Sequence, residues 1–224
     1  PDPGAAAGWP LLLLRALLPA MKGFLARTEL LRPQQWVKNA FVLVGLVFGH
    51  AWHDAAMVWA GLGATLAFCF ASGAVYAFND ARDVEQDRGH PDKRSRPVAR
   101  GAVSPGEAMG IAGGAAAASV ALAAWVDWKV AAIIGGYLAV SAAYTLWLKR
   151  VPVIDVVVIA AGFMLRLLAG TLGIGIEPSR WLLACGFLLT LFLGFAKRRA
   201  EIGHLAQDAA LHRAVLEAYS IGFL

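Results

Sequence analysis

Charged side chains are scarce in this sequence: they make up 16% of its 224 residues, whereas 59% of the residues are hydrophobic. With a mean hydropathy of +0.61, this balance excludes an ordinary soluble globular domain. The alternation of apolar and polar residues that a transmembrane β-barrel needs is also missing. The apolar runs are instead continuous and helix-length, so we expect an all-α, polytopic transmembrane helix bundle.

Cysteine is nearly absent as well, because the chain has only Cys69 and Cys185. Both lie inside apolar runs, which predicts inert packing residues and no disulfide framework. A Sec-type signal peptide is not recognisable, since the apolar stretch at 11–18 is short, contains Arg15 and is followed by Pro19. This stretch is more typical of an interfacial helix than of a span. We therefore expect a tail with an interfacial helix at 1–30 and a transmembrane domain at 31–224.

About six membrane spans can be placed from the apolar runs. They cover residues 37–52, 55–78, 107–126, 129–148, 151–176 and 181–196. Lysine and arginine concentrate before the first span, in the second and fourth connections, and after the sixth span. Both ends and every basic loop are therefore expected on the cytoplasmic side.

Small residues are dense in the third span. Gly110, Gly113 and Gly114 are followed by alanines at 115–118. Surfaces of this kind let helices approach closely in lipid. We interpret them as a helix-packing face.

One acidic stretch ends the second span. It reads Asn79-Asp80-Ala81-Arg82-Asp83-Val84-Glu85-Gln86-Asp87. In a continuous helix of about 100° per residue, Asn79, Asp80, Asp83 and Asp87 share one face and Glu85 points away. Such a face suits Mg²⁺, which takes a few carboxylates and completes its shell with water and phosphate oxygens. A solvated helix end is the competing interpretation, but the position at a membrane-helix mouth, before a basic loop, favours the metal.

Cationic and polar side chains accompany this motif along the predicted cytoplasmic face. They are Lys38 and Asn39; Lys93, Arg94 and Arg96; Tyr144, Lys149 and Arg150; and Lys197 and Arg198 with Glu201. Positive-inside charge alone would explain any single cation. Together with the acidic motif they indicate a site for a polyanion bridged by Mg²⁺.

Two ionisable residues, Asp155 and Arg166, lie inside the fifth span. They are about three turns apart and share a stripe about 16 Å long. An arginine so deep in a span is a functional hypothesis by default. It would hold an anionic lipid head group or form a structural ion pair with another helix, and the sequence favours neither.

Together these residues resemble the UbiA superfamily of intramembrane prenyltransferases. The Asn-Asp-x-x-Asp-x-x-x-Asp pattern at 79–87 is similar to its first aspartate-rich motif, which binds Mg²⁺-diphosphate. Segments 32–39, 79–101, 144–155 and 197–201 are most similar to the decaprenyl-phosphate phosphoribosyltransferase branch. The second aspartate motif of ordinary members is absent, and Lys197, Arg198, Arg199 and Glu201 stand in its place. The resemblance implies about nine spans, so 31–224 is expected to be an incomplete UbiA-like catalytic domain.

The resemblance implies a membrane-embedded transferase. It would move 5-phosphoribose from phosphoribosyl diphosphate to a polyprenyl (decaprenyl) phosphate and release diphosphate, for cell-wall arabinan precursor synthesis. The implied cofactor is Mg²⁺, held by the catalytic set Asn79, Asp80, Asp83 and Asp87. The cationic and polar residues named above, with Asp155 and Arg166, are the expected substrate contacts. The expected location is the bacterial inner membrane with the site facing the cytoplasm; no nucleic acid is expected as a partner, and the oligomeric state stays open.

Other functions compete with this one. A prenyltransferase that joins a polyprenyl diphosphate to an aromatic acceptor uses the same first motif. A cation transporter is disfavoured because the acids lie at one membrane face and no pair of broken helices is evident. A structural scaffold would leave the acidic face unexplained.

Overall fold

The computed structural model describes residue 18 and residues 21–205, with side chains for residue 18 and residues 21–200. The long elements in this part of the chain are α3 (Ala55–Arg82), α5 (Pro105–Val126), α6 (Trp128–Leu146), α7 (Ile154–Ala169) and α8 (Arg180–Leu205). All five are long and apolar enough to cross a membrane, α7 together with the 3-10 turn η5 (Leu172–Ile174). The predicted all-α transmembrane bundle is confirmed, and the chain is a multi-pass membrane protein. The expected interfacial helix at 11–18 falls almost entirely outside the described residues.

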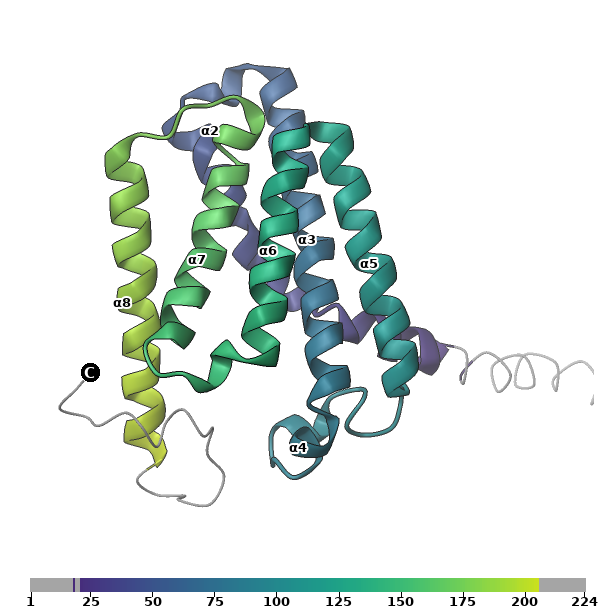
Figure 1. Cartoon of the computed structure of the whole chain (residues 1–224). Coiled ribbons are helices and arrows are strands. Elements are labelled where there is room, and N and C mark those ends of the chain that lie inside the picture. Colours follow the sequence, from purple (N-terminus) through teal and green to yellow (C-terminus); the bar gives the residue numbers. More distant parts are fainter. Residues whose placement is uncertain (1–17, 19–20, 206–224) are drawn as a thin grey trace, which may run out of the picture.

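Helices that follow one another in the chain also pack together, and α3 packs on both α5 and α6 (Figure 1).

Short polar residues start the helices. The Asp54 carboxylate accepts from the first amides of α3, and the Ser104 hydroxyl accepts from the amide of Glu107 in α5. Asp127 has an extended backbone that ends α5, and its carboxylate accepts from Lys129 N at 2.7 Å to cap α6. Such caps satisfy amides that have no partner within the helix.

The basic loops all lie at one end of the bundle. Figure 1 shows α4 (Val84–Arg88), the α6–α7 connection and the C-terminal end of α8 at the lower end, and α2 (Val44–Phe48) at the upper end. The helical residues 21–30 join the lower end through two ion pairs, Arg27 with Glu107 at 2.6 Å and Arg100 with Glu29 at 2.7 Å. The expectation that these segments share one side is confirmed.

The first predicted span is wrong as an α-helix. Its residues form η1 (Pro33–Leu43), a 3-10 helix, followed by α2 and the short η2 (Ala51–His53). The segment still runs along α3 in the opposite direction. Arg32 bonds Asp80, Asn39 bonds Ser72, and Leu46 lies against Gly61.

The 3-10 geometry explains how so short a segment follows α3 so far. The stretch of α3 between Gly61 and Asp80 is about 28 Å long at about 1.5 Å per residue. The 11 residues of η1 cover about 22 Å at about 2.0 Å per residue, the rise of a 3-10 helix. With the first three residues of α2, the stretch from Arg32 to Leu46 covers about 26 Å, whereas an α-helix of the same residues would cover about 21 Å. A run of 3-10 helix this long is uncommon, and together with α2 it nearly matches the thickness of the hydrocarbon core, about 30 Å.

Close backbone contact fixes the far end of this segment against α7. A Cβ on Gly45 would lie 1.8 Å from the Gly170 carbonyl oxygen, and one on Gly170 would lie 1.6 Å from the Val42 carbonyl oxygen. Any side chain at either glycine would force the two elements apart. The η1–α2 segment is therefore held by glycine contacts at the upper end and by charge at the lower end.

Candidate functional site

A cavity of about 490 Å³ opens at the lower end of the bundle. Its lining comes from Arg32 just before η1, from α3, α4, the α4–α5 loop and α6, and from the 3-10 turn η4 (Leu148–Arg150). The lining residues are Arg32, Val75, Tyr76, Asn79, Asp83, Gln86, Asp87, Lys93, Arg96, Tyr144, Thr145, Lys149 and Arg150. Eight of the predicted site residues are therefore brought together, from segments more than sixty positions apart.

The acidic motif does not lie on one continuous helix. The helix α3 ends at Arg82, Asp83 has φ −99° and ψ 14°, and α4 starts at Val84. Such bridge-region conformations recur in active sites. Asn79, Asp83 and Asp87 line the cavity wall, whereas Asp80, which pairs with Arg32 and Arg96, lies outside the lining. The prediction of one four-oxygen face is corrected in this respect.

Asp80 is the buried anchor of the site, with 1% of its surface exposed. Arg32 Nη2 donates to Asp80 Oδ1 at 2.6 Å, and Arg96 Nη1 donates to the same oxygen at 3.2 Å. Arg96 also donates to Asp87 Oδ2 at 2.6 Å. The second oxygen of Asp80 has no hydrogen-bond partner within the described part of the chain.

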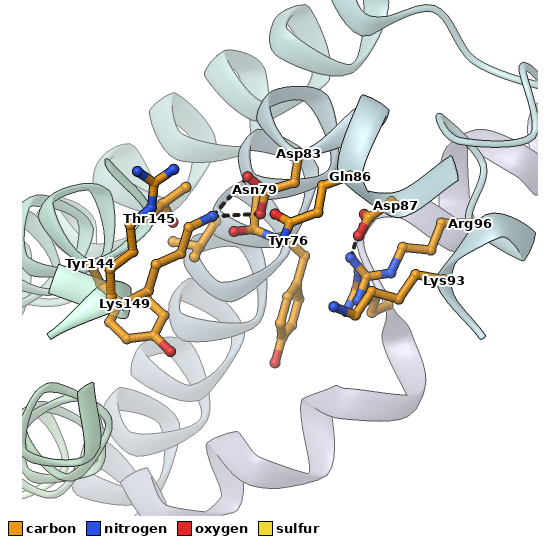
Figure 2. Close-up of a pocket in the computed structure, with 13 residues that line it drawn as sticks. Tyr76, Asn79, Asp83, Gln86, Asp87, Lys93, Arg96, Tyr144, Thr145 and Lys149 are labelled. Carbon is orange, nitrogen blue, oxygen red and sulfur yellow. Dashed lines mark hydrogen bonds and ion pairs between the residues drawn. The ribbon is translucent and has the colours of Figure 1, made fainter. Parts of the chain in front are cut away.

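Lys149 closes the other side of the acidic motif. Its ammonium group donates to both oxygens of Asp83, at 2.7 and 2.6 Å. Figure 2 shows Lys149 reaching Asp83 from the side of Tyr144 and Thr145, whereas Lys93 and Arg96 approach Asp87 from the opposite side. Two groups of cations therefore face each other across the end of α3.

The donor set suits a hard cation in its chemistry. Residues 18 and 21–200 contain no group of three or more acidic, His or Cys side chains arranged to hold a metal. The carboxylates of Asp83 and Asp87 are instead occupied by Lys149 and Arg96. Mg²⁺ needs only one or two carboxylates beside substrate and water oxygens, and Asp80 offers an unbonded oxygen. The residues therefore fit the ion once a cation has moved aside.

His90, in the loop after α4, adds no cation to the site at neutral pH. Burial lowers the pKa of His90, and the nearby charge of Lys93 lowers it further. Its Nδ1 accepts from the amide of Asp92 at 3.2 Å, which fits the neutral ring. The positive charge of this loop therefore comes from its lysine and arginines.

Several predicted contacts lie away from the cavity lining. Lys38, Arg94 and Lys197 are exposed elsewhere. The side chain of Glu201 is outside the described residues. Asp155 and Arg198 are both buried, and Arg198 Nε donates to Asp155 Oδ2 at 2.8 Å, which ties α8 to α7.

Arg166 and Asn39 form a separate buried network. Arg166 donates to Asn39 Oδ1 at 2.8 Å, to the Gly162 carbonyl at 2.8 Å and to the Tyr137 hydroxyl at 3.2 Å. Its guanidinium also lies 5.4 Å from the centre of the Phe68 ring. All of these acceptors are neutral. In the described part of the chain, Arg166 is therefore held by neutral hydrogen-bond acceptors and not by the structural ion pair considered above.

Four polar residues of the cavity lining are not among the predicted site residues: Arg32, Tyr76, Gln86 and Thr145. Tyr76 lies one turn before Asn79, so extending the helix face backwards would have found it. Thr145 follows Tyr144 directly. Arg32 has no such signal, because only the fold brings it over the Tyr76 ring, 4.7 Å from the ring centre.

The buried Asp155–Arg198 pair allows a test of whether Arg198 stabilises the fold or contacts the substrate. Replacing Arg198 by Met removes the guanidinium facing a buried carboxylate, so we expect a loss of about 3–5 kcal/mol in unfolding free energy. The double variant Asp155→Leu/Arg198→Met should recover most of this loss. Unfolding in detergent, followed by fluorescence, measures both. Unchanged stability in the single variant would contradict the structural role.

Comparisons with known proteins agree with this geometry. The chain is 40% identical to a decaprenyl-phosphate phosphoribosyltransferase of Corynebacterium glutamicum, over 87% of this chain and 60% of that protein, and 38% identical to one of Mycolicibacterium smegmatis, over 86% and 62%. It therefore spans about 60% of the length of these curated relatives. A UbiA homolog from Archaeoglobus fulgidus bound to GPP and Mg²⁺ has the same fold, with a TM-score of 0.70 and 23% identity over 86% of this chain and 69% of that one. Residues 39–217 match the UbiA prenyltransferase family, and the chain belongs to that family.

Proposed function

We propose that this protein transfers 5-phosphoribose from phosphoribosyl diphosphate to a polyprenyl phosphate and releases diphosphate. The observation that carries the proposal is the charge pattern of the cavity. Five cations and two carboxylates line it. Figure 2 shows Lys149 on one side of the end of α3 and Lys93 with Arg96 on the other. Arg32 joins Arg96 at Asp80, and Arg150 follows Lys149 in η4, so the five cations form two groups. The names of the relatives in Corynebacterium and Mycolicibacterium support the same reaction.

Two separated cation groups suit a donor with two anionic ends. Phosphoribosyl diphosphate carries a diphosphate at C1 and a phosphate at C5, so each end can meet arginine or lysine side chains. A prenyl diphosphate has only one anionic end, and its other end is apolar. The aromatic-acceptor alternative therefore leaves one group of cations without an anionic partner on the donor.

During transfer, the cavity residues and the lipid phosphate would have separate roles. The cations neutralise charge on the diphosphate as the C1–O bond breaks and the bonding electrons leave with diphosphate. An oxygen of the lipid phosphate then supplies the electron pair for the new bond to C1. This phosphate is already an anion, so no general base is needed. The cavity must bind, orient and neutralise, which are tasks for its Arg, Lys and Asn side chains.

Mg²⁺ is the proposed cofactor, held by Asp83 and Asp87 with Asn79 and the free oxygen of Asp80. When bound, it would withdraw charge from the diphosphate leaving group. The solved relatives bound to Mg²⁺ with GPP or DMAPP support a divalent ion in this family. Lys149 and Arg96, which now bond Asp83 and Asp87, would then turn to the phosphate oxygens.

We further propose that the lower end of the bundle faces the cytoplasm of a bacterial inner membrane. The concentration of lysine and arginine at that end supports this orientation. Residues 31–224 would form the catalytic unit. A cytoplasmic cavity gives a water-soluble donor direct access, while the lipid acceptor reaches it from the bilayer.

Asp83 and Glu85 give a matched test of this site. Asp83→Asn removes a proposed metal ligand, so donor binding in the presence of Mg²⁺ should weaken by about tenfold or more, the worth of one charge-assisted contact. Glu85→Gln makes the same chemical change on an exposed side chain paired with Arg88, and should leave binding unchanged. Titration calorimetry with phosphoribosyl diphosphate, with and without Mg²⁺, measures both. Equal affinities in the two variants would contradict the assignment.

Lys149 allows a second test, because it competes with the metal for Asp83. In Lys149→Gln, Mg²⁺ alone should bind several-fold more tightly, since the carboxylate is released. Phosphoribosyl diphosphate should bind more weakly, since a phosphate contact is lost. The same titrations, run with each ligand separately, resolve the two effects. Weaker Mg²⁺ binding in this variant would show that Lys149 does not compete with the ion.

A further inference from the structure

An apolar groove runs along the outside of the bundle between α3, α5 and α6. Its volume is about 280 Å³. The residues that line it are Ala74, Val75, Phe78, Met109, Ala112, Gly113, Ala116, Leu138 and Ala142. No member of this lining is charged or has a polar side chain.

Small side chains make room for the groove, because five of its nine lining residues are alanine or glycine. A Cβ on Gly113 would meet nothing within 4 Å, and the same holds for Gly110 and Gly114. In the described part of the chain these glycines therefore do not form the predicted helix-packing face, whereas Ala115 of the same small-residue run is buried in a span that packs on α3. At Gly113, the missing side chain leaves space that the groove uses.

The groove and the charged cavity adjoin each other. Val75 lines both of them. Along α3, Phe78 of the groove is followed directly by Asn79 of the cavity, and along α6, Ala142 is followed two positions later by Tyr144. The groove therefore lies beside the cavity and, along α6, extends further from the lower end of the bundle toward the middle of the membrane.

A charged cavity with an adjoining apolar groove suits a ligand with an anionic head and an apolar chain. The cavity would hold the head beside the donor, and the groove would cover the chain. Because lipid is as apolar as the groove, the groove would hold the chain by close packing and not by removing it from water. Alanine and glycine walls leave room for a chain with methyl branches.

We propose that this groove holds the first isoprene units of the polyprenyl phosphate acceptor, an inference that rests on the proposed function. The phosphate then lies in the cavity near Val75, while the rest of the chain continues into the bilayer. The groove thereby positions the acceptor next to the donor. Two other occupants would fill it differently: a second copy of this chain, or an acyl chain of any bilayer lipid.

Filling the groove tests the proposal. Gly113→Leu places an isobutyl group in it, where the space is open, so the fold should tolerate the change. We expect the KM for polyprenyl phosphate to rise at least about fivefold, a typical cost of overfilling a packed site, with the KM for phosphoribosyl diphosphate unchanged. Gly114→Leu is the matched control, because Gly114 is the next residue of α5, is equally open and does not line the groove. Ala142→Leu fills the groove from its opposite wall and should behave like Gly113→Leu.

Photo-crosslinking separates this inference from the proposed function, because it needs no turnover. A polyprenyl phosphate with a diazirine on its first isoprene units should label Met109 or Ala112, and Gly113→Leu should abolish the labelling. Unlabelled polyprenyl phosphate should compete, and phosphatidylglycerol should not. Labelling of the groove without any transfer would uphold the groove and overturn the reaction. Transfer with labelling elsewhere would do the reverse.

Two further outcomes would also overturn the inference. Equal competition by phosphatidylglycerol would make the groove a general lipid contact. A change of oligomeric size in Gly113→Leu, with acceptor KM unchanged, would make it an interface between copies. Gly114→Leu run beside it shows whether either effect is specific to the groove.

Discussion

The buried carboxylate of Asp80 is the constraint on which the site depends. A carboxylate out of water is costly unless cations and donors surround it, and here Arg32 and Arg96 both donate to one of its oxygens. These arginines come from the start of η1 and from the α4–α5 loop, so one buried charge brings three distant segments together. Arg96 extends the cluster to Asp87 in α4. The same contacts that fix the lower end of the bundle therefore also form one wall of the cavity.

Lys149 on Asp83 and Arg96 on Asp87 neutralise these acids, which keeps a membrane-proximal cluster of carboxylates from repelling itself. Under the proposed function, binding of a metal–diphosphate pair would require an exchange of partners. The acids would then take the metal, and the cations would take the phosphates. The adjoining groove has apolar walls that suit an apolar chain. Head and chain of a lipid phosphate would then meet surfaces of matching character.

The sequence predicts the helices and much of the cavity because those features are local. Continuous apolar runs set the spans, and the spacing of Asn79, Asp83 and Asp87 places them on one wall. Prediction from the sequence fails where contacts between distant segments determine the position of a residue. Asp80 pairs with Arg32 and Arg96 outside the cavity lining. The 3-10 helix replaces the first predicted α-helical span, and Arg198 pairs with Asp155. Arg32 could not be found from spacing, because its partners Asp80 and Tyr76 lie far along the chain. The glycines of α5 mislead for a related reason: small residues suit close packing and an open groove equally well.

Binding of a donor with two anionic ends by the two cation groups can be tested by direct competition between donors. The purified chain is offered polyprenyl phosphate with either phosphoribosyl diphosphate or an isoprenyl diphosphate, each radiolabelled, and label in the lipid phase is followed with and without Mg²⁺. We expect Mg²⁺-dependent labelled lipid from phosphoribosyl diphosphate alone. Label transferred from the isoprenyl diphosphate to an added aromatic acceptor, with none from phosphoribosyl diphosphate, would contradict this expectation.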